Sequence, residues 1–203
     1  ELHFQGLVSS ADVRNGILFP QKFDDCYLRF ERPNRTSLEN GVKTGTSIVC
    51  STSKDLFTWE EKAVVMQGRP HFWDELIGSG PPPIKTHAGW LHIYHGVATH
   101  FGSSNIYQAG VALHDLNEPW KVLARGKYNI LEPRENYELC GQVPNVIFPT
   151  ALWVHPHNAD NHILKSDVAT PESKVYLYYG AADTSVCMAE TTIATLLEEV
   201  YAQ

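Results

Sequence analysis

Histidine and cysteine are the side chains in this sequence best suited to hold a metal, and their spacing argues against a metal site. The ten histidines are scattered, with no His-Glu-x-x-His pattern and no Cys/His ligand spacing. Four cysteines lie far apart without a Cys-x-x-Cys pair: Cys26, Cys50, Cys140 and Cys187. We therefore interpret them as small buried side chains of a reducing compartment and expect a cytoplasmic protein that needs no metal.

Composition and charge narrow the class of protein further. The chain has 203 residues, of which 43% are hydrophobic and 19% charged, which is typical of one globular domain over residues 1–203. Its net charge of −7 disfavours nucleic acid as a partner but leaves room for a local basic pocket. The sequence contains no run of 18 apolar residues, so we expect no membrane partner.

The elements that must position any reactive side chain are mostly strands. Short runs rich in β-branched and aromatic residues, bounded by turn residues, occur at 17–19, 26–30, 47–50, 90–94 and 175–179. One helical pattern closes the chain at 192–200, where Ile193, Leu196, Leu197 and Val200 fall on one face. The sequence therefore predicts an all-β fold with a C-terminal helix.

A repeated unit organises these strands. An apolar-Pro entry, a hairpin and a further strand recur three times, with Pro20, Pro83 and Pro149 at matching positions. Repetition of a four-stranded unit at this interval is typical of a β-propeller. Three blades are too few to close a ring, so we expect this to be an incomplete propeller domain that upstream sequence or a partner completes.

Nine sequence motifs, in order along the chain, resemble those of glycoside hydrolase family 130, the β-mannoside phosphorylase family. They are residues 14–20 (RNGILFP), 31–33 (ERP), 53–56 (SKDL), 77–86 (IGSGPPPIKT), 89–97 (GWLHIYHGV), 107–110 (YQAG), 113–116 (LHDL), 144–149 (PNVIFP) and 178–184 (YYGAADT). The resemblance implies a five-bladed propeller, about three blades of which are present here. It also implies phosphorolysis of β-mannosides by a catalytic aspartate that lies upstream of Arg14.

The resemblance assigns a phosphate cradle to Arg14, Arg32 and Lys85. A phosphorylase can omit the general base because phosphate is already an anionic nucleophile, so it needs cations that hold the phosphate in line with the anomeric carbon. The expected reaction is inverting and yields α-mannose 1-phosphate, with inorganic phosphate as co-substrate and no other cofactor. Position alone would instead make the arginines solvated surface charges and Lys85 a turn residue.

Four further residues are candidates for sugar contacts. The resemblance makes Asp183 a mannosyl ligand, although an Asp at a turn commonly bonds its own backbone. Asn15, beside Arg14, could bond sugar or phosphate. His95 and Tyr107 are weaker candidates, because each can equally serve as a packed structural residue.

Three alternative functions remain open from the sequence. A β-mannoside hydrolase of the same family would need a second carboxylate and little of the basic trio. A catalytically inactive propeller fragment could bind glycans or protein partners. An unrelated propeller of the arabinanase type would predict neither the three cations nor the GPPPIK motif. The expected partners are a β-mannoside oligosaccharide and phosphate; the linkage, β-1,2 or β-1,4, and a homo-oligomeric state stay undetermined.

Overall fold

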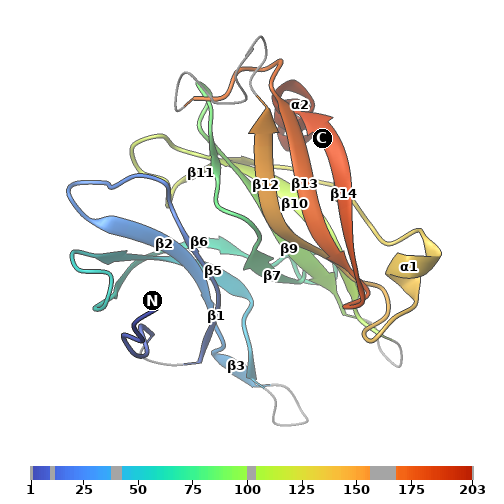
Figure 1. The fold of residues 1–203 in the computed structure, drawn as a ribbon, viewed down its shortest axis with the longest axis horizontal. Helices are drawn as coiled ribbons and strands as arrows, with labels where there is room; N and C mark the ends of the chain where they lie inside the picture. Colours follow the sequence, from blue (N-terminus) through green and yellow to red (C-terminus); the bar gives the residue numbers. More distant parts are fainter. Residues whose placement is uncertain (1, 10–11, 38–42, 100–103, 156–167, 203) are drawn as a thin grey trace.

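The part of the chain that the structure describes forms three antiparallel β-sheets, a short two-stranded ribbon and two helices. A computed structural model describes residues 2–9, 12–37, 43–99, 104–155 and 168–202. The sheets follow one another along the chain, and the second lies between the first and the third (Figure 1). The predicted all-β fold is confirmed, and the three sheets correspond to the three repeat units found in the sequence.

The first sheet has strand order β1-β2-β5-β6. Its strands are β1 (Val13–Leu18), β2 (Tyr27–Pro33), β5 (Ser47–Ser53) and β6 (Glu60–Gln67). A two-stranded ribbon, β3 (Thr36–Ser37) and β4 (Lys43–Thr44), branches from the link between β2 and β5. Alternation along β2 points Leu28 and Phe30 into the core and Arg29 and Glu31 to the opposite face.

The second sheet has strand order β11-β10-β9-β7, and the short strand β8 also pairs with β9. Its strands are β7 (Leu76–Ser79), β8 (Ile84–Lys85), β9 (Trp90–Ala98), β10 (Ile106–His114) and β11 (Val122–Arg125). The strands β9 and β10 are almost wholly buried because other elements cover both of their faces. A strand buried on both faces has a nearly continuous run of apolar residues, and this run is the pattern that predicted a strand at residues 90–94.

The third sheet has strand order β12-β13-β14. Its strands are β12 (Ile147–His155), β13 (Lys174–Ala181) and β14 (Ser185–Thr192). The helix α2 (Ile193–Tyr201) follows directly and begins at Thr192, whose hydroxyl accepts a hydrogen bond from the Thr195 N–H. This confirms the predicted terminal helix. The single-turn helix α1 (Asn136–Leu139) was not predicted, since four residues are too few for a helical periodicity.

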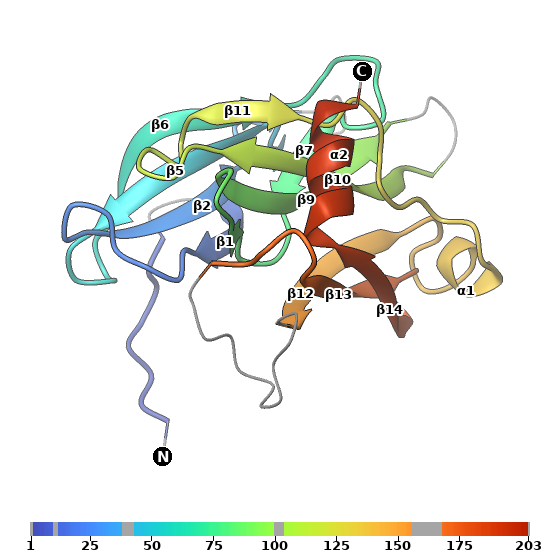
Figure 2. The same ribbon diagram turned by 90° about the horizontal axis from the view of Figure 1, so that it is seen from above.

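Two apolar cores join the three sheets. The first core lies between the first and second sheets and contains Phe19, Phe30 and Trp90, whose rings meet edge to face. The second core lies between the second and third sheets, and α2 contributes the residues Ile193, Leu196 and Val200 to it. Figure 2 shows α2 lying across the second sheet above the ends of the third. The second sheet therefore fixes the positions of its two neighbours.

The described part of the chain has neither a membrane-spanning helix nor a metal cluster. Its two helices lack the length and apolar character that crossing a bilayer requires. Within the same ranges, histidine, cysteine and acidic side chains form no group of three or more that could hold a metal ion.

Candidate functional site

Two arginines lie opposite each other at one end of the first sheet. The antiparallel pairing of β1 and β2 places Arg14 across from Arg32. The Arg14 side chain is 58% exposed and lies 3.8 Å from the Asp12 carboxylate. Arg32 is more enclosed, so burial lowers its guanidinium pKa, the nearby Arg14 charge lowers it further, and Tyr107 and Asp12 oppose that shift. Two cations held together in this way favour an anion as a third partner.

An asparagine in a kinked part of β1 reaches the second sheet. Asn15 has φ of 55°, in the left-handed region that asparagine tolerates, and the β1–β2 register shifts between Arg14 and Ile17. Its amide oxygen is close to Gly78, because a Cβ added at Gly78 would lie 2.8 Å from it. The kink thus turns the Asn15 side chain away from the regular alternation of β1 and toward β7.

His95 lies at the same place from the side of β9. It pairs with Gly78 across β7 and β9, and a Cβ at Gly78 would lie only 2.4 Å from the His95 Cε1. Burial lowers the pKa of His95 to about 3, and the Arg32 charge adds to this effect. The imidazole is therefore neutral near pH 7, with one nitrogen able to donate and the other able to accept a hydrogen bond.

Two aromatic rings enclose His95 from the other side. The His95 ring lies 4.6 Å from Phe148 of β12 and 6.2 Å from Tyr107 of β10, measured between ring centroids. Tyr107 is attached to the third sheet, since its N–H donates to the Asn145 carbonyl at 2.9 Å and it bridges to Val146. All three sheets therefore contribute to one group, the central cluster, made of Arg14, Asn15, Arg32, His95, Tyr107 and Phe148.

The central cluster holds buried polar atoms that have no hydrogen-bond partner among the described residues. They are the Asn15 Oδ1, the Arg32 Nε and the His95 Nδ1. Leaving a buried polar group unsatisfied costs about 1–3 kcal/mol, so three such atoms in one place require an explanation. A polar ligand that accepts from Arg32 and bonds to Asn15 and His95 would supply the partners.

Five of the seven predicted site residues thus come together, and Lys85 does not. Lys85 pairs with Trp90 at the opposite end of β9, five residues before His95, which is about 17 Å along a strand. Its ammonium group donates to the Gln21 Oε1 at 2.6 Å and lies 5.5 Å from the centre of the Trp90 ring. Within the described ranges, no contact supports the expectation that Lys85 shares a channel with Arg14.

Asp183 lies near the central cluster but outside its described contacts. It is exposed in the turn between β13 and β14, with φ of 50°. The preceding residue, Ala182, donates its N–H to the Val146 carbonyl at 3.0 Å, and Val146 bridges to Tyr107. The backbone therefore places the Asp183 turn beside the Tyr107 side of the cluster.

Sequence reasoning missed Gly78 and Phe148 as parts of the site. Both belong to motifs that the sequence displays, 77–86 and 144–149, yet neither carries a polar group that would mark it as functional. A glycine inside a strand often marks a close approach of another group, and that signal could have identified Gly78.

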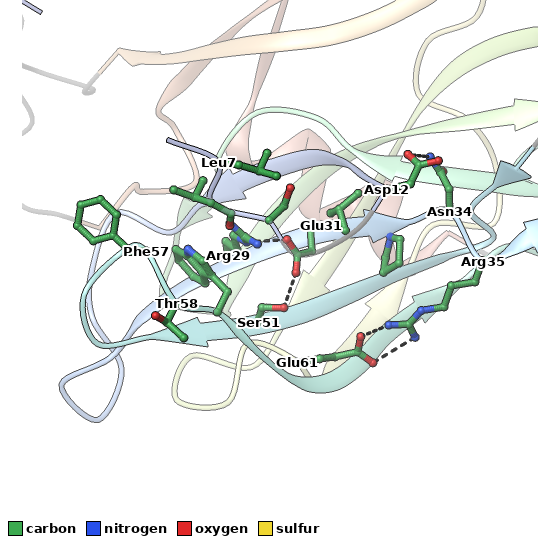
Figure 3. A pocket seen from close by; sticks show the side chains of 15 residues that line it. Leu7, Asp12, Arg29, Glu31, Asn34, Arg35, Ser51, Phe57, Thr58 and Glu61 are labelled. Atoms are coloured by element: carbon green, nitrogen blue, oxygen red, sulfur yellow. Dashed lines mark hydrogen bonds and ion pairs between the residues drawn. The ribbon is translucent and has the colours of Figure 1, made fainter. Parts of the chain in front are cut away.

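A pocket on the outer face of the first sheet is a weaker candidate, because its polar groups compensate one another (Figure 3). It has a volume of about 450 Å³ and contains the buried ion pair Arg29–Glu31, with 2.6 Å between the Nε and Oε2 atoms. The Ser51 hydroxyl also donates to Glu31, and an Arg29 amino group donates to the Val8 carbonyl at 3.0 Å. These groups leave little bonding capacity for a ligand.

Comparison with known proteins decides the family. The family model described as beta-1,4-mannooligosaccharide phosphorylase matches residues 3–202. The chain belongs to glycoside hydrolase family 130. The chain is 37% identical to a β-1,4-mannooligosaccharide phosphorylase of Ruminococcus albus over 188 residues, which is 92% of this chain and 50% of that protein.

Solved structures agree with this assignment. The β-1,2-mannobiose phosphorylase of Listeria innocua, in complex with β-1,2-mannobiose, superposes with a TM-score of 0.78 at 32% identity, covering 98% of this chain and 49% of that one. A structure reported with glycoside hydrolases that target β-1,2-mannosidic linkages has a TM-score of 0.64 at 24% identity and shares the fold. The chain spans about half the length of the curated relatives it matches.

Proposed function

We propose that this protein is an inverting glycoside phosphorylase that cleaves β-mannosides with inorganic phosphate and releases α-mannose 1-phosphate. The observation that carries the proposal is the central cluster, in which opposed arginines lie beside buried polar atoms that have no partner in the described part of the chain. Membership of family 130 and the phosphorylase names of the curated relatives support it. Here a β-mannoside oligosaccharide is the substrate and phosphate the co-substrate.

In this proposal Arg32 and Arg14 hold the phosphate. A planar guanidinium can donate two parallel hydrogen bonds to a phosphate, which fixes the direction of the attacking oxygen. That oxygen forms a bond to the anomeric carbon as the glycosidic C–O bond breaks. The leaving oxygen takes its proton from a general acid, which the family resemblance places before Arg14. His95, as a neutral imidazole, and Asn15 would orient phosphate or sugar hydroxyls without adding charge.

Asp183 and Tyr107 complete the proposed sugar site. A carboxylate is a suitable acceptor for two neighbouring sugar hydroxyls, and the Asp183 turn adjoins Tyr107 through Val146. The family resemblance also implies Lys85 as a phosphate ligand, but we leave Lys85 out of this proposal because its ammonium group is engaged with Gln21.

For the architecture we propose a single five-bladed β-propeller domain, of which residues 1–203 form three blades and the C-terminal helix. Each sheet is an antiparallel meander, and the first strands β1, β7 and β12 all adjoin the central cluster. This is the arrangement expected when the inner strands of successive blades surround one axis. The apolar outer face of the third sheet, with Trp153, Tyr178 and Val186 exposed, would then pack against a further blade.

The deciding experiment uses the purified full-length gene product. It is incubated with β-1,4- or β-1,2-mannobiose with and without phosphate, and mannose 1-phosphate and free mannose are measured. We expect turnover only with phosphate, and a loss of about tenfold to a thousandfold in kcat/KM for Arg32→Ala. Arg35→Ala is the matched control, because Arg35 is 64% exposed and pairs with Glu61 outside the cluster. Equal rates with and without phosphate, with free mannose as product, would show a hydrolase instead.

A further inference from the structure

An open hollow of about 960 Å³ lies beside the candidate site, at the same end of the second sheet. Aromatic and polar side chains line it: His71, Phe72, Trp73, Glu75, Gln108 and Tyr128. Gln108 directly follows Tyr107 of the central cluster on β10, so this one strand lies between the hollow and the central cluster. Because neighbouring side chains on a strand point to opposite faces, the hollow opens on the other face from Tyr107.

The aromatic wall of the hollow is fixed in place. Trp73 lies over Gly96 and Gly110, where an added Cβ would come within 2.5 Å and 2.3 Å of its ring. Its indole N–H donates to the Lys127 carbonyl at 2.9 Å, and its ring stacks on Tyr94 at 5.8 Å. Since the N–H is satisfied internally and two glycines make room for the ring, the wall needs little reorganisation to bind a ligand.

A buried network of charged side chains holds the residues next to this aromatic wall in place. The Asp74 carboxylate is fully buried and accepts hydrogen bonds from Arg69 at 2.8 Å, Arg125 at 2.5 Å and the Tyr94 hydroxyl at 2.9 Å. Arg69 also covers the Phe72 ring at 4.4 Å. These bonds tie the segment before β7 to β9 and β11, so the aromatic rings are held by the fold rather than by a mobile loop.

The free surface of the hollow combines apolar rings with hydrogen-bond acceptors. Phe72 and the 54%-exposed Tyr128 present ring surface to solvent. The Glu75 carboxylate already accepts from the Thr99 hydroxyl and keeps acceptor capacity, and the Gln108 amide bonds to Asn129. A flat apolar ring beside a carboxylate suits a sugar, whose C–H face packs on the ring while its hydroxyls donate to the acid.

We propose that this hollow is an outer sugar subsite, which holds a distal mannosyl unit of a chain whose scissile end lies in the central cluster. The inference rests on the proposed phosphorylase function and adds a preference for chains longer than two sugars. Tyr128 contributes its ring face, Trp73 the fixed wall and Glu75 the hydroxyl acceptor.

The test compares short and long substrates in the full-length gene product. KM and kcat are measured with phosphate for mannobiose and mannotetraose in both linkages. We expect Tyr128→Ala to raise KM for mannotetraose about threefold to tenfold, the effect of losing one aromatic contact, and to leave mannobiose unchanged. Tyr128→Phe keeps the ring and should behave as wild type. Tyr201→Ala, which removes a similarly exposed tyrosine from α2, is the matched control and should change neither substrate.

The following results would contradict the proposed subsite. A Tyr128→Ala variant with equal changes for both lengths, or with none, would do so, as would an equal effect of Tyr201→Ala. If wild type releases no mannose 1-phosphate at all, the proposed function has failed, and binding decides the subsite separately. Calorimetric titration with mannotetraose should then show threefold to tenfold weaker binding to Tyr128→Ala, whereas unchanged affinity would refute the subsite.

Discussion

Arg14 on β1 lies directly opposite Arg32 on β2, so two guanidinium groups leave neighbouring strands at the same point of the first sheet. Like charges in directly opposed positions destabilise a sheet by up to about 1 kcal/mol, and burial of Arg32 adds to that cost. The Asp12 carboxylate offsets only part of this repulsion, since it lies 3.8 Å from the exposed Arg14. The pair is therefore better suited to binding an anion than to holding the sheet together.

Phosphate should accordingly stabilise the folded protein. A ligand that binds only the folded state adds about 2.7 kcal/mol at a concentration of 100 Kd, so the melting temperature of wild type should rise with phosphate. Arg32→Ala should abolish most of this rise, and Arg35→Ala should keep it. Thermal melts in phosphate and in chloride of equal ionic strength measure the difference. An equal phosphate shift in Arg32→Ala and wild type would remove Arg32 from the anion site.

Lys85 should separate from the arginines in the same assays. Because its ammonium group is held by Gln21 at the far end of β9, Lys85→Ala should leave the KM for phosphate within about twofold of wild type. A modest loss of stability, about 1 kcal/mol, is expected from the lost hydrogen bond to the half-buried Gln21 amide. The KM for phosphate is measured in the turnover assay and stability by urea unfolding. A tenfold rise in that KM would restore Lys85 to the phosphate site, as the family resemblance implies.

The sequence predicted the strands and the terminal helix well, because their apolar periodicity is local. It could not show that Asn15 and His95 meet at Gly78, since that contact depends on a kink in β1 and on the pairing of β7 with β9. Nor could the sequence show that Lys85 lies apart from Arg14 and Arg32. All three cations belong to motifs of the family resemblance, and only the pairing of Lys85 with Trp90 shows which end of the second sheet Lys85 occupies.

Gly78 should be the most sensitive small residue of the site. Gly78→Ala would place a Cβ 2.4 Å from His95 and 2.8 Å from Asn15, so one or both side chains must move. We expect kcat/KM to fall at least tenfold, with a stability loss of about 1–3 kcal/mol from overpacking. Gly16→Ala is the control, because no described residue lies within 4 Å of a Cβ there. Wild-type turnover in Gly78→Ala would show that the positions of His95 and Asn15 do not matter.

Three buried histidines should make the stability of the protein depend on pH. His92 and His114 form a fully buried pair, with 3.3 Å between the His92 Nδ1 and the His114 Nε2, against the Phe30 ring. Burial lowers the pKa of His114 to about 4 and that of His95 to about 3, and it lowers the pKa of His92 as well. All three imidazoles are therefore neutral in the folded protein.

The sign of the effect follows from the unfolded chain, in which histidine has a pKa of about 6.5. Between that value and the folded pKa the unfolded state binds more protons, so the stability contributed by these groups is complete above about pH 6.5 and is lost as the pH falls toward 4. Each histidine contributes a slope of up to ~1.4 kcal/mol per pH unit.

Urea unfolding of the full-length protein should therefore give a nearly constant free energy of unfolding from pH 8 to 7 and a steep decrease from pH 6 to 5. His92→Gln removes one titrating group from the pair and should reduce this slope. A free energy of unfolding that stays constant from pH 7.5 to 5 would contradict the neutral, buried state of the three histidines.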